Sequence, residues 1–181
     1  MIATVLMSVA IFTSAGEIDV SLDATHAPQT VANFIHYVRG GYFTGGTFFR
    51  TVTTKPDNQP GKTVKIDVIQ ATHNVKAHPK LAPPVHFEPT SRTGIVHDDG
   101  TISMARDAKL DTAQTDFFIC SGPQPGLDDG GKRSADHRGF AAFGHVTRGM
   151  DVVRAIQRMP SKDQVLLAPV KIERIVVTST R

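Results

Sequence analysis

Hydrophobic and polar residues alternate in several short segments of this chain. Val9 and Ile11 alternate with small residues before the turn-forming residues 14–16, and a second alternating run extends from Ile18 to Leu22. A period of two residues is typical of a strand whose two faces meet different surroundings. These residues therefore predict a first β-hairpin.

The same reasoning predicts further short strands over residues 47–52, 66–71, 85–87, 100–105, 116–120, 141–146 and 170–178. Gly, Pro and Asn separate several of them. Many short strands without internal repeats favour a mainly β fold, a closed antiparallel barrel with helices over its openings. The alternation alone does not distinguish a barrel from a sandwich.

Two segments show the spacing of a helix with one apolar face. The first carries Val31, Phe34, Ile35 and Val38. It starts near Pro28, which suits a first helical turn, and ends before glycines 40–41. The second opens at residues 149–151, and its apolar positions are Met150, Val153 and Ile156.

Composition limits the partners that we expect. The 181 residues are 40% hydrophobic and 20% charged, which suits one globular domain over residues 1–181. The formal charge of +3 comes without any run of like charges, so no nucleic-acid partner is expected. No apolar stretch is long enough to span a membrane, so no membrane association is expected either. Nothing in the sequence suggests an obligate interface, and we expect a monomer.

The first fifteen residues form a short apolar segment that resembles the hydrophobic core of a signal peptide. No Lys or Arg precedes them, so the positive region of such a signal is missing. We therefore favour the hairpin, with residues 1–6 as a possible leader and a cytoplasmic protein. A periplasmic location is the alternative if residues 1–15 are a signal.

Cysteine and histidine do not suggest redox or metal chemistry. The single cysteine, Cys120, excludes an internal disulfide, and its apolar neighbours predict a small buried side chain. The eight histidines form no H-x-x-x-H pair. We expect them to be scattered on the surface, with no metal site and no cofactor.

Four segments, in this order and spacing, resemble the cyclophilin family of peptidyl-prolyl cis/trans isomerases. Residues 27–34 are similar to the family's A-P-x-T-x-x-N-F helix, and residues 46–50 to its G-T-x-F-H-R, with Phe49 where histidine is usual. Residues 100–105, followed by 116–119, resemble G-x-[IL]-[SA]-M-A and the later Q-F-F-I. Residues 139–151 are close to V-F-G-x-V-x-x-G-M-x-V.

The resemblance implies an eight-stranded antiparallel barrel capped by two α-helices. It also implies an enzyme that accelerates rotation of Xaa-Pro bonds in proline-containing polypeptides and assists their folding. Resonance gives this rotation a barrier of about 18–20 kcal/mol. No covalent bond breaks, so such an enzyme needs only to bind the twisted bond better than either planar form.

The same resemblance assigns roles to residues of the site. Arg50 would donate a hydrogen bond to the twisted imide nitrogen, Gln70 would fix Arg50, and Phe118 would form the floor of a proline pocket. Further apolar pocket positions are Val68, Leu127 and Phe140. Ala105 and Arg106 fall where the family contacts the peptide backbone, and Asp116 stands where glutamine is usual, beside the peptide groove.

Three departures from the family pattern stand out. Residues 54–65 form an inserted loop after the strand that carries Arg50. Asp67 then occupies the position where the family has a phenylalanine of the proline pocket. Gly126 falls on the tryptophan with which many members hold cyclosporin, so weak cyclosporin binding is expected.

Two other functions stay open at this point. One is a proline-peptide binding module or chaperone that is catalytically weak, which Asp116 and the inserted loop motivate. The other is a barrel that encloses a small apolar ligand. The second is disfavoured because apolar residues such as Ile11, Phe34, Phe117 and Phe143 are expected to fill the interior.

Overall fold

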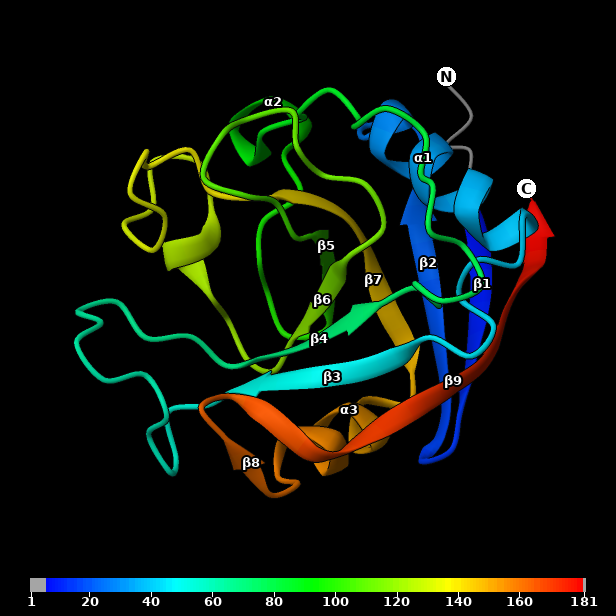
Figure 1. Cartoon of the computed structure of the whole chain (residues 1–181). Helices are drawn as coiled ribbons and strands as arrows, with labels where there is room; N and C mark the ends of the chain where they lie inside the picture. The colour runs from blue at the N-terminus through cyan, green and yellow to red at the C-terminus, as the bar shows by residue number, and fades with distance from the viewer. Residues whose placement is uncertain (1–5, 181) are drawn as a thin grey trace.

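The structure is a computed structural model that describes residues 6–180, and its strands form one antiparallel sheet that closes on itself (Figure 1). The strands are β1 (Leu6–Thr13), β2 (Gly16–Asp23), β3 (Thr47–Val52), β4 (Val68–Thr72), β5 (Thr101–Met104), β6 (Phe117–Cys120), β7 (Ala141–Arg148), β8 (Ser161–Lys162) and β9 (Val165–Thr180). Eight of them follow the order β1-β2-β7-β5-β6-β4-β3-β9, and β9 also pairs with β1. This pairing closes the barrel, while β8 adds only a short hairpin to β9.

Two helices cover the ends of the barrel. α1 (Pro28–Arg39) packs against β2, β7 and β9, and α3 (Met150–Gln157) packs against β2, β3 and β4 at the opposite end (Figure 1). Gly149 allows α3 to start immediately after β7, because its φ is +98° and an added Cβ would lie 2.4 Å from the carbonyl oxygen of Glu17. No helix within residues 6–180 is long and apolar enough to cross a bilayer.

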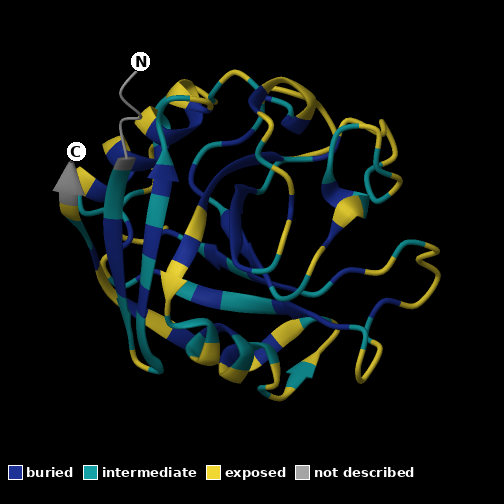
Figure 2. Ribbon diagram, turned by 180° about the vertical axis from the view of Figure 1, so that it is seen from behind, coloured by how far each residue is buried: buried dark blue, intermediate teal, exposed yellow. Residues whose placement is uncertain are grey.

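Aromatic side chains fill the interior of the barrel. Phe34 reaches down from α1, and its ring centroid lies 5.4 Å from Phe43, 5.5 Å from Phe117 and 5.2 Å from Phe143. All four rings are at most 1% exposed, and Figure 2 shows exposed residues mainly in the loops and on the outer faces of the helices. The interior is therefore a packed core, which argues against a barrel that encloses a ligand.

The expected barrel and its two capping helices are confirmed. The predicted strand at residues 85–87 is wrong: this stretch is irregular, and Val85 and Phe87 donate instead to the Ala113 carbonyl and the Asp111 carboxylate. Three small elements were not predicted: the four-residue α2 (Thr90–Thr93), the 3-10 helix η1 (Pro125–Leu127) and β8. Of the possible leader at residues 1–6, residues 1–5 lie outside the described part of the chain.

Cys120 provides a test of the packing around β6. Its side chain is fully buried, and burial raises the pKa of the thiol, with Asp128 and Asp99 adding to the effect. The thiolate is the reactive form, so the folded protein should react with a disulfide reagent at least about 100-fold more slowly than the chain in guanidinium. Stoichiometric labelling of the folded protein within minutes would contradict this packing.

Candidate active site

A bulge in β3 turns Arg50 to the outside of the barrel. In a regular strand Phe48, Arg50 and Val52 would share one face. Phe48 instead belongs to the barrel core and Val52 to a second apolar cluster on the outer surface, and the register of β3 shifts between Phe48 and Arg50 in both of its pairings. A bulge reverses which face the later residues occupy. Arg50 is thereby paired directly with Gln70 of β4.

Two glutamine side chains hold the Arg50 guanidinium. Its Nη1 donates to Oε1 of Gln70 at 2.8 Å, and its Nε donates to Oε1 of Gln164 at 3.1 Å. Its Nη2 donates to the same Gln164 oxygen. Burial lowers the pKa of Arg50, although an arginine in a protein stays protonated. The cation is thus held by neutral acceptors and keeps its full charge.

The outer faces of β3, β4 and β6 form an apolar cavity beside Arg50. Its volume is about 200 Å³. Eight of the nine predicted site residues line it: Arg50, Gln70, Val68, Ala105, Arg106, Phe118, Leu127 and Phe140. Val52, Ile66 and Arg133 complete the wall. An apolar hollow with a fixed guanidinium at its edge suits a small hydrophobic ring that carries a polar atom.

Phe118 forms the floor of this cavity and is held from two sides. Its ring meets Phe140 edge-on at 5.5 Å and stacks on His97 at 5.9 Å. His97 is itself fixed, since its Nδ1 lies 2.7 Å from Asp128 Oδ1 and its Nε2 lies 2.9 Å from Ser103 Oγ. The prediction that the histidines are solvent-facing is therefore wrong for His97, which is only 1% exposed because it packs under the floor. It is also wrong for His73, which is 8% exposed.

Successive residues of β6 separate this cavity from the barrel core. The neighbouring Phe117 points into the core, whereas Phe118 belongs to the outer cluster. The alternation of a strand explains the difference, because successive side chains point to opposite faces.

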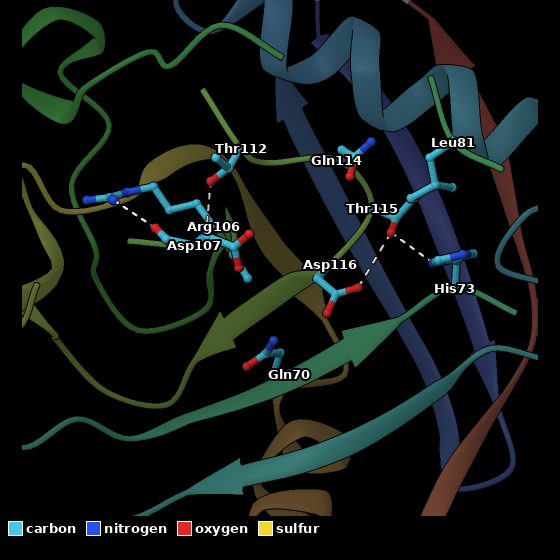
Figure 3. Close-up of a pocket in the computed structure, with 10 residues that line it drawn as sticks. Gln70, His73, Leu81, Arg106, Asp107, Thr112, Gln114, Thr115 and Asp116 are labelled. Carbon is cyan, nitrogen blue, oxygen red and sulfur yellow. Dashed lines mark hydrogen bonds between the residues drawn. The ribbon is translucent and has the colours of Figure 1, made fainter. Parts of the chain in front are cut away.

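Asp116, the ninth predicted residue, lines an adjoining hollow of about 240 Å³ (Figure 3). Gln70, Ala105 and Arg106 lie between the two hollows, because they line both. The Asp116 carboxylate accepts from Thr72 Oγ1 at 2.7 Å and lies beside Thr115, which in turn contacts His73. The two hollows together form one groove, and Asp107 lines the second hollow along with Asp116.

The loop between β3 and β4, residues 53–67, forms the remaining wall and shows what Asp67 does. Asp67 accepts from the Thr54 backbone N–H at 2.8 Å and from Thr54 Oγ1 at 2.9 Å, so its carboxylate holds the loop and does not line the pocket. The neighbouring Ile66, 7% exposed, lines the cavity in its place. That this loop is an insertion relative to the family stays a prediction.

Sequence reasoning missed Gln164 and Arg133. Gln164 lies in the turn between β8 and β9 and is 114 residues from Arg50. Its unusual φ of +69° is not visible in the sequence. Arg133 lies in the irregular stretch of residues 128–140. No local pattern connects either residue with the cavity, because the barrel's topology alone brings them there.

The described residues, 6–180, contain no group of three or more His, Cys, Asp or Glu side chains that could hold a metal ion.

Comparison with known proteins agrees with this architecture. The family model described as "Cyclophilin type peptidyl-prolyl cis-trans isomerase/CLD" matches residues 8–177. Peptidyl-prolyl cis-trans isomerase A of Dickeya dadantii (strain 3937) is 34% identical over 161 residues, which cover 89% of this chain and 76% of that protein. Peptidyl-prolyl cis-trans isomerase cyp18 of Streptomyces antibioticus is 30% identical over 176 residues, covering 97% and 98%.

A solved structure shows the same fold. The cyclophilin-type isomerase of Cryptosporidium parvum superposes with a TM-score of 0.74 at 20% identity, covering 96% of this chain and 98% of that one. Because the family model spans nearly the whole chain and two relatives reach 30% identity, this chain belongs to the cyclophilin-type peptidyl-prolyl cis-trans isomerases, enzymes that act on proline-containing peptides.

Proposed function

We propose that this isomerase works without a covalent intermediate, by donating a hydrogen bond from Arg50 to the imide nitrogen of a twisted Xaa-Pro bond whose ring occupies the cavity over Phe118. One observation carries the proposal: a guanidinium that two neutral glutamines fix at the edge of an apolar hollow of about 200 Å³.

The hydrogen-bond inventory of Arg50 supports this role. A guanidinium has five N–H donors. Gln70 and Gln164 take three of them, one on each nitrogen. One N–H on each terminal nitrogen therefore has no acceptor within the described residues and is available to a substrate.

The transition state gains more from this donor than the ground state does. In the planar imide the nitrogen lone pair is delocalised into the carbonyl, whereas in the twisted form it is localised and accepts a hydrogen bond. A preorganised donor aimed at such a site is worth about 3–4 kcal/mol in other enzymes. A solved structure of the Cryptosporidium parvum relative was determined in the presence of the dipeptide Ala-Pro, which agrees with a proline-peptide substrate for this fold.

Asp116 gives the groove a preference on one side. Its carboxylate sits half-buried in the hollow next to the proline cavity. A carboxylate in that position favours a basic or polar residue on the adjoining side of the substrate.

We also propose that the chain acts as a monomer. The barrel closes through β1 and β9, so its long strands have no unpaired edge of the kind that pairs with another chain. Among the exposed large hydrophobic side chains of the described residues, Val165 and Leu167 lie together on β9, whereas Val75, Val96 and Leu110 lie in three different loops.

A second candidate is a proline-peptide binding module with little turnover. Asp116 and the loop of residues 54–65, which differ from the family pattern that the sequence suggested, motivate it. Binding alone does not require a guanidinium held in one geometry, so removing Arg50 separates the two functions.

Replacing Arg50 tests the catalytic proposal. We expect Arg50→Ala to lower kcat/KM for an Ala-Pro peptide by about 100- to 1,000-fold, because the donor to the imide is lost. Arg50→Lys should fall between, since it keeps the charge but loses the fixed planar fork. A chymotrypsin-coupled or NMR-exchange assay measures both variants.

Arg148→Ala is a matched control, because Arg148 is exposed and pairs with Glu17 and Asp19 away from the cavity. It should retain activity within about twofold. A folded Arg50→Ala variant with native activity would contradict the role of Arg50, and a native protein that binds the peptide without accelerating exchange would favour the binding module.

Gln164→Ala tests whether the turn residue positions Arg50. We expect kcat to fall about 10- to 100-fold with KM nearly unchanged, because the guanidinium loses two of its three anchors. In the Arg50→Ala background the same change should have almost no effect, since coupled residues are not additive. Asp163→Ala, in the same turn, controls for the turn itself. Equal effects of Gln164→Ala with and without Arg50 would show a purely structural role.

Cyclosporin is expected to bind weakly, with a Kd above about 1 μM by calorimetry. Gly126 replaces the family's tryptophan, and an added Cβ there would lie 2.4 Å from Cγ1 of Val64. The β3–β4 loop thus occupies the space where a larger side chain would begin. Nanomolar binding would show that the drug is held by other contacts.

A further inference from the structure

Three arginines line the proline cavity, and only one of them is neutralised. Arg106 forms a two-pronged ion pair with Asp136 at 2.8 and 2.9 Å. Arg50 is held by glutamines. Arg133 donates to Oε1 of Gln59 and to a backbone carbonyl, and no carboxylate within residues 6–180 lies within ion-pair distance of it or of Arg50. Two uncompensated positive charges therefore face one small hollow.

Arg133 is fixed in place before any ligand arrives. Its backbone N–H donates to the Gly126 carbonyl at 3.1 Å, and its Nη1 donates to Gln59 Oε1 at 2.9 Å and to the Val64 carbonyl at 2.8 Å. Gln59 is 1% exposed and is itself anchored, because it exchanges hydrogen bonds with the backbone of Ile66. The rotamer entropy that an arginine normally loses on binding is thus already lost.

The remaining donors of Arg133 are available to a ligand. Two of its five N–H groups are used, both on Nη1. Nε and Nη2 therefore present three N–H groups that have no acceptor among the residues that the structure describes. Their arrangement suits the two oxygens of a carboxylate, which a guanidinium binds side by side.

The electrostatics of the cavity favour an anion as well. Burial and then the charge of Arg50 lower the pKa of Arg133, so the two cations destabilise each other across the empty hollow. A carboxylate placed next to them relieves this repulsion and replaces lost hydration. A neutral amide of the same shape would gain only the hydrogen bonds.

We propose that Arg133 is a specificity-determining residue, which makes this isomerase prefer proline segments that carry an acidic residue directly before or directly after the proline. The inference rests on the proposed function of the same cavity. A hollow of about 200 Å³ holds little more than one ring, so a side chain on its wall reaches only the residues adjacent to the proline. Arg133 would favour an acidic residue on one side of the substrate, and Asp116 in the adjoining hollow would favour a basic residue on the other side.

The test compares matched peptides in which one residue is Glu or Gln. NMR exchange measures kcat/KM for Ala-Ala-Pro-Glu-Ala against Ala-Ala-Pro-Gln-Ala, and for Ala-Glu-Pro-Ala-Ala against Ala-Gln-Pro-Ala-Ala. In one register or both, the Glu peptide should be preferred about three- to tenfold at low salt, and the ratio should shrink in about 0.5 M NaCl because the ion pair is screened. Ratios below threefold in both registers would overturn the proposal.

Variants assign the preference to Arg133. Arg133→Met should abolish the Glu/Gln ratio, because it lowers kcat/KM for the Glu peptide more than for the Gln peptide. Arg133→Gln removes the charge but keeps a donor for the Val64 carbonyl, so it repeats the test if the methionine variant unfolds. Lys132→Met removes the same charge from an exposed neighbour and should leave the ratio unchanged. A ratio that survives in a folded, neutral Arg133 variant would also overturn the proposal.

The Gln peptides distinguish a failure of the proposed function from a failure of the proposed role of Arg133. If the native protein does not accelerate their exchange, the proposed function fails. If it does, and shows no preference for Glu, only the role of Arg133 fails.

Discussion

The closure of the sheet by the pairing of β1 with β9 is the constraint on which the rest of the molecule depends. A closed barrel gives every strand an inner and an outer face. The inner face is filled by rings such as Phe34 and Phe117, so no binding site can form there. Apolar residues that point outwards from β3, β4 and β6 are therefore left to form a second cluster, and that cluster lines the cavity proposed to bind proline.

In the proposed mechanism, catalysis depends on a local irregularity of the barrel. The bulge in β3 moves Arg50 from the core side to the outer side, directly opposite Gln70. Neutral glutamines then fix the guanidinium without cancelling its charge, which an Asp or Glu in either position would do. Arg106 differs from Arg50, because its partner Asp136 is a carboxylate that neutralises its charge. Two arginines of one groove thus differ in net charge because their partners differ in charge.

Local patterns in the sequence predicted most of the fold and of the candidate site. The helical spacing around Phe34 predicted a helix, and the motif residues around Arg50 and Phe118 predicted residues that line the cavity. Both patterns could be recognised because they involve residues that are close together in the sequence. The strand expected at residues 85–87 was wrong because its backbone groups pair with distant loop groups. Gln164 and Arg133 were missed, and the burial of His97 too, because these features arise only where the closed topology brings remote segments together.

The way the β3–β4 loop is attached has a consequence for how this enzyme can diverge. Its ties to the barrel include the side chains of Asn58 and Gln59, which bond to backbone groups of β3 and of residues at the loop's two ends. Its tip, residues 60–63, is exposed. Lengthening a loop costs little closure entropy, since the cost grows only with the logarithm of length. The tip is thus a natural insertion point, where a foreign peptide or a docking epitope can be displayed beside the groove while the anchors of the catalytic arginine stay intact.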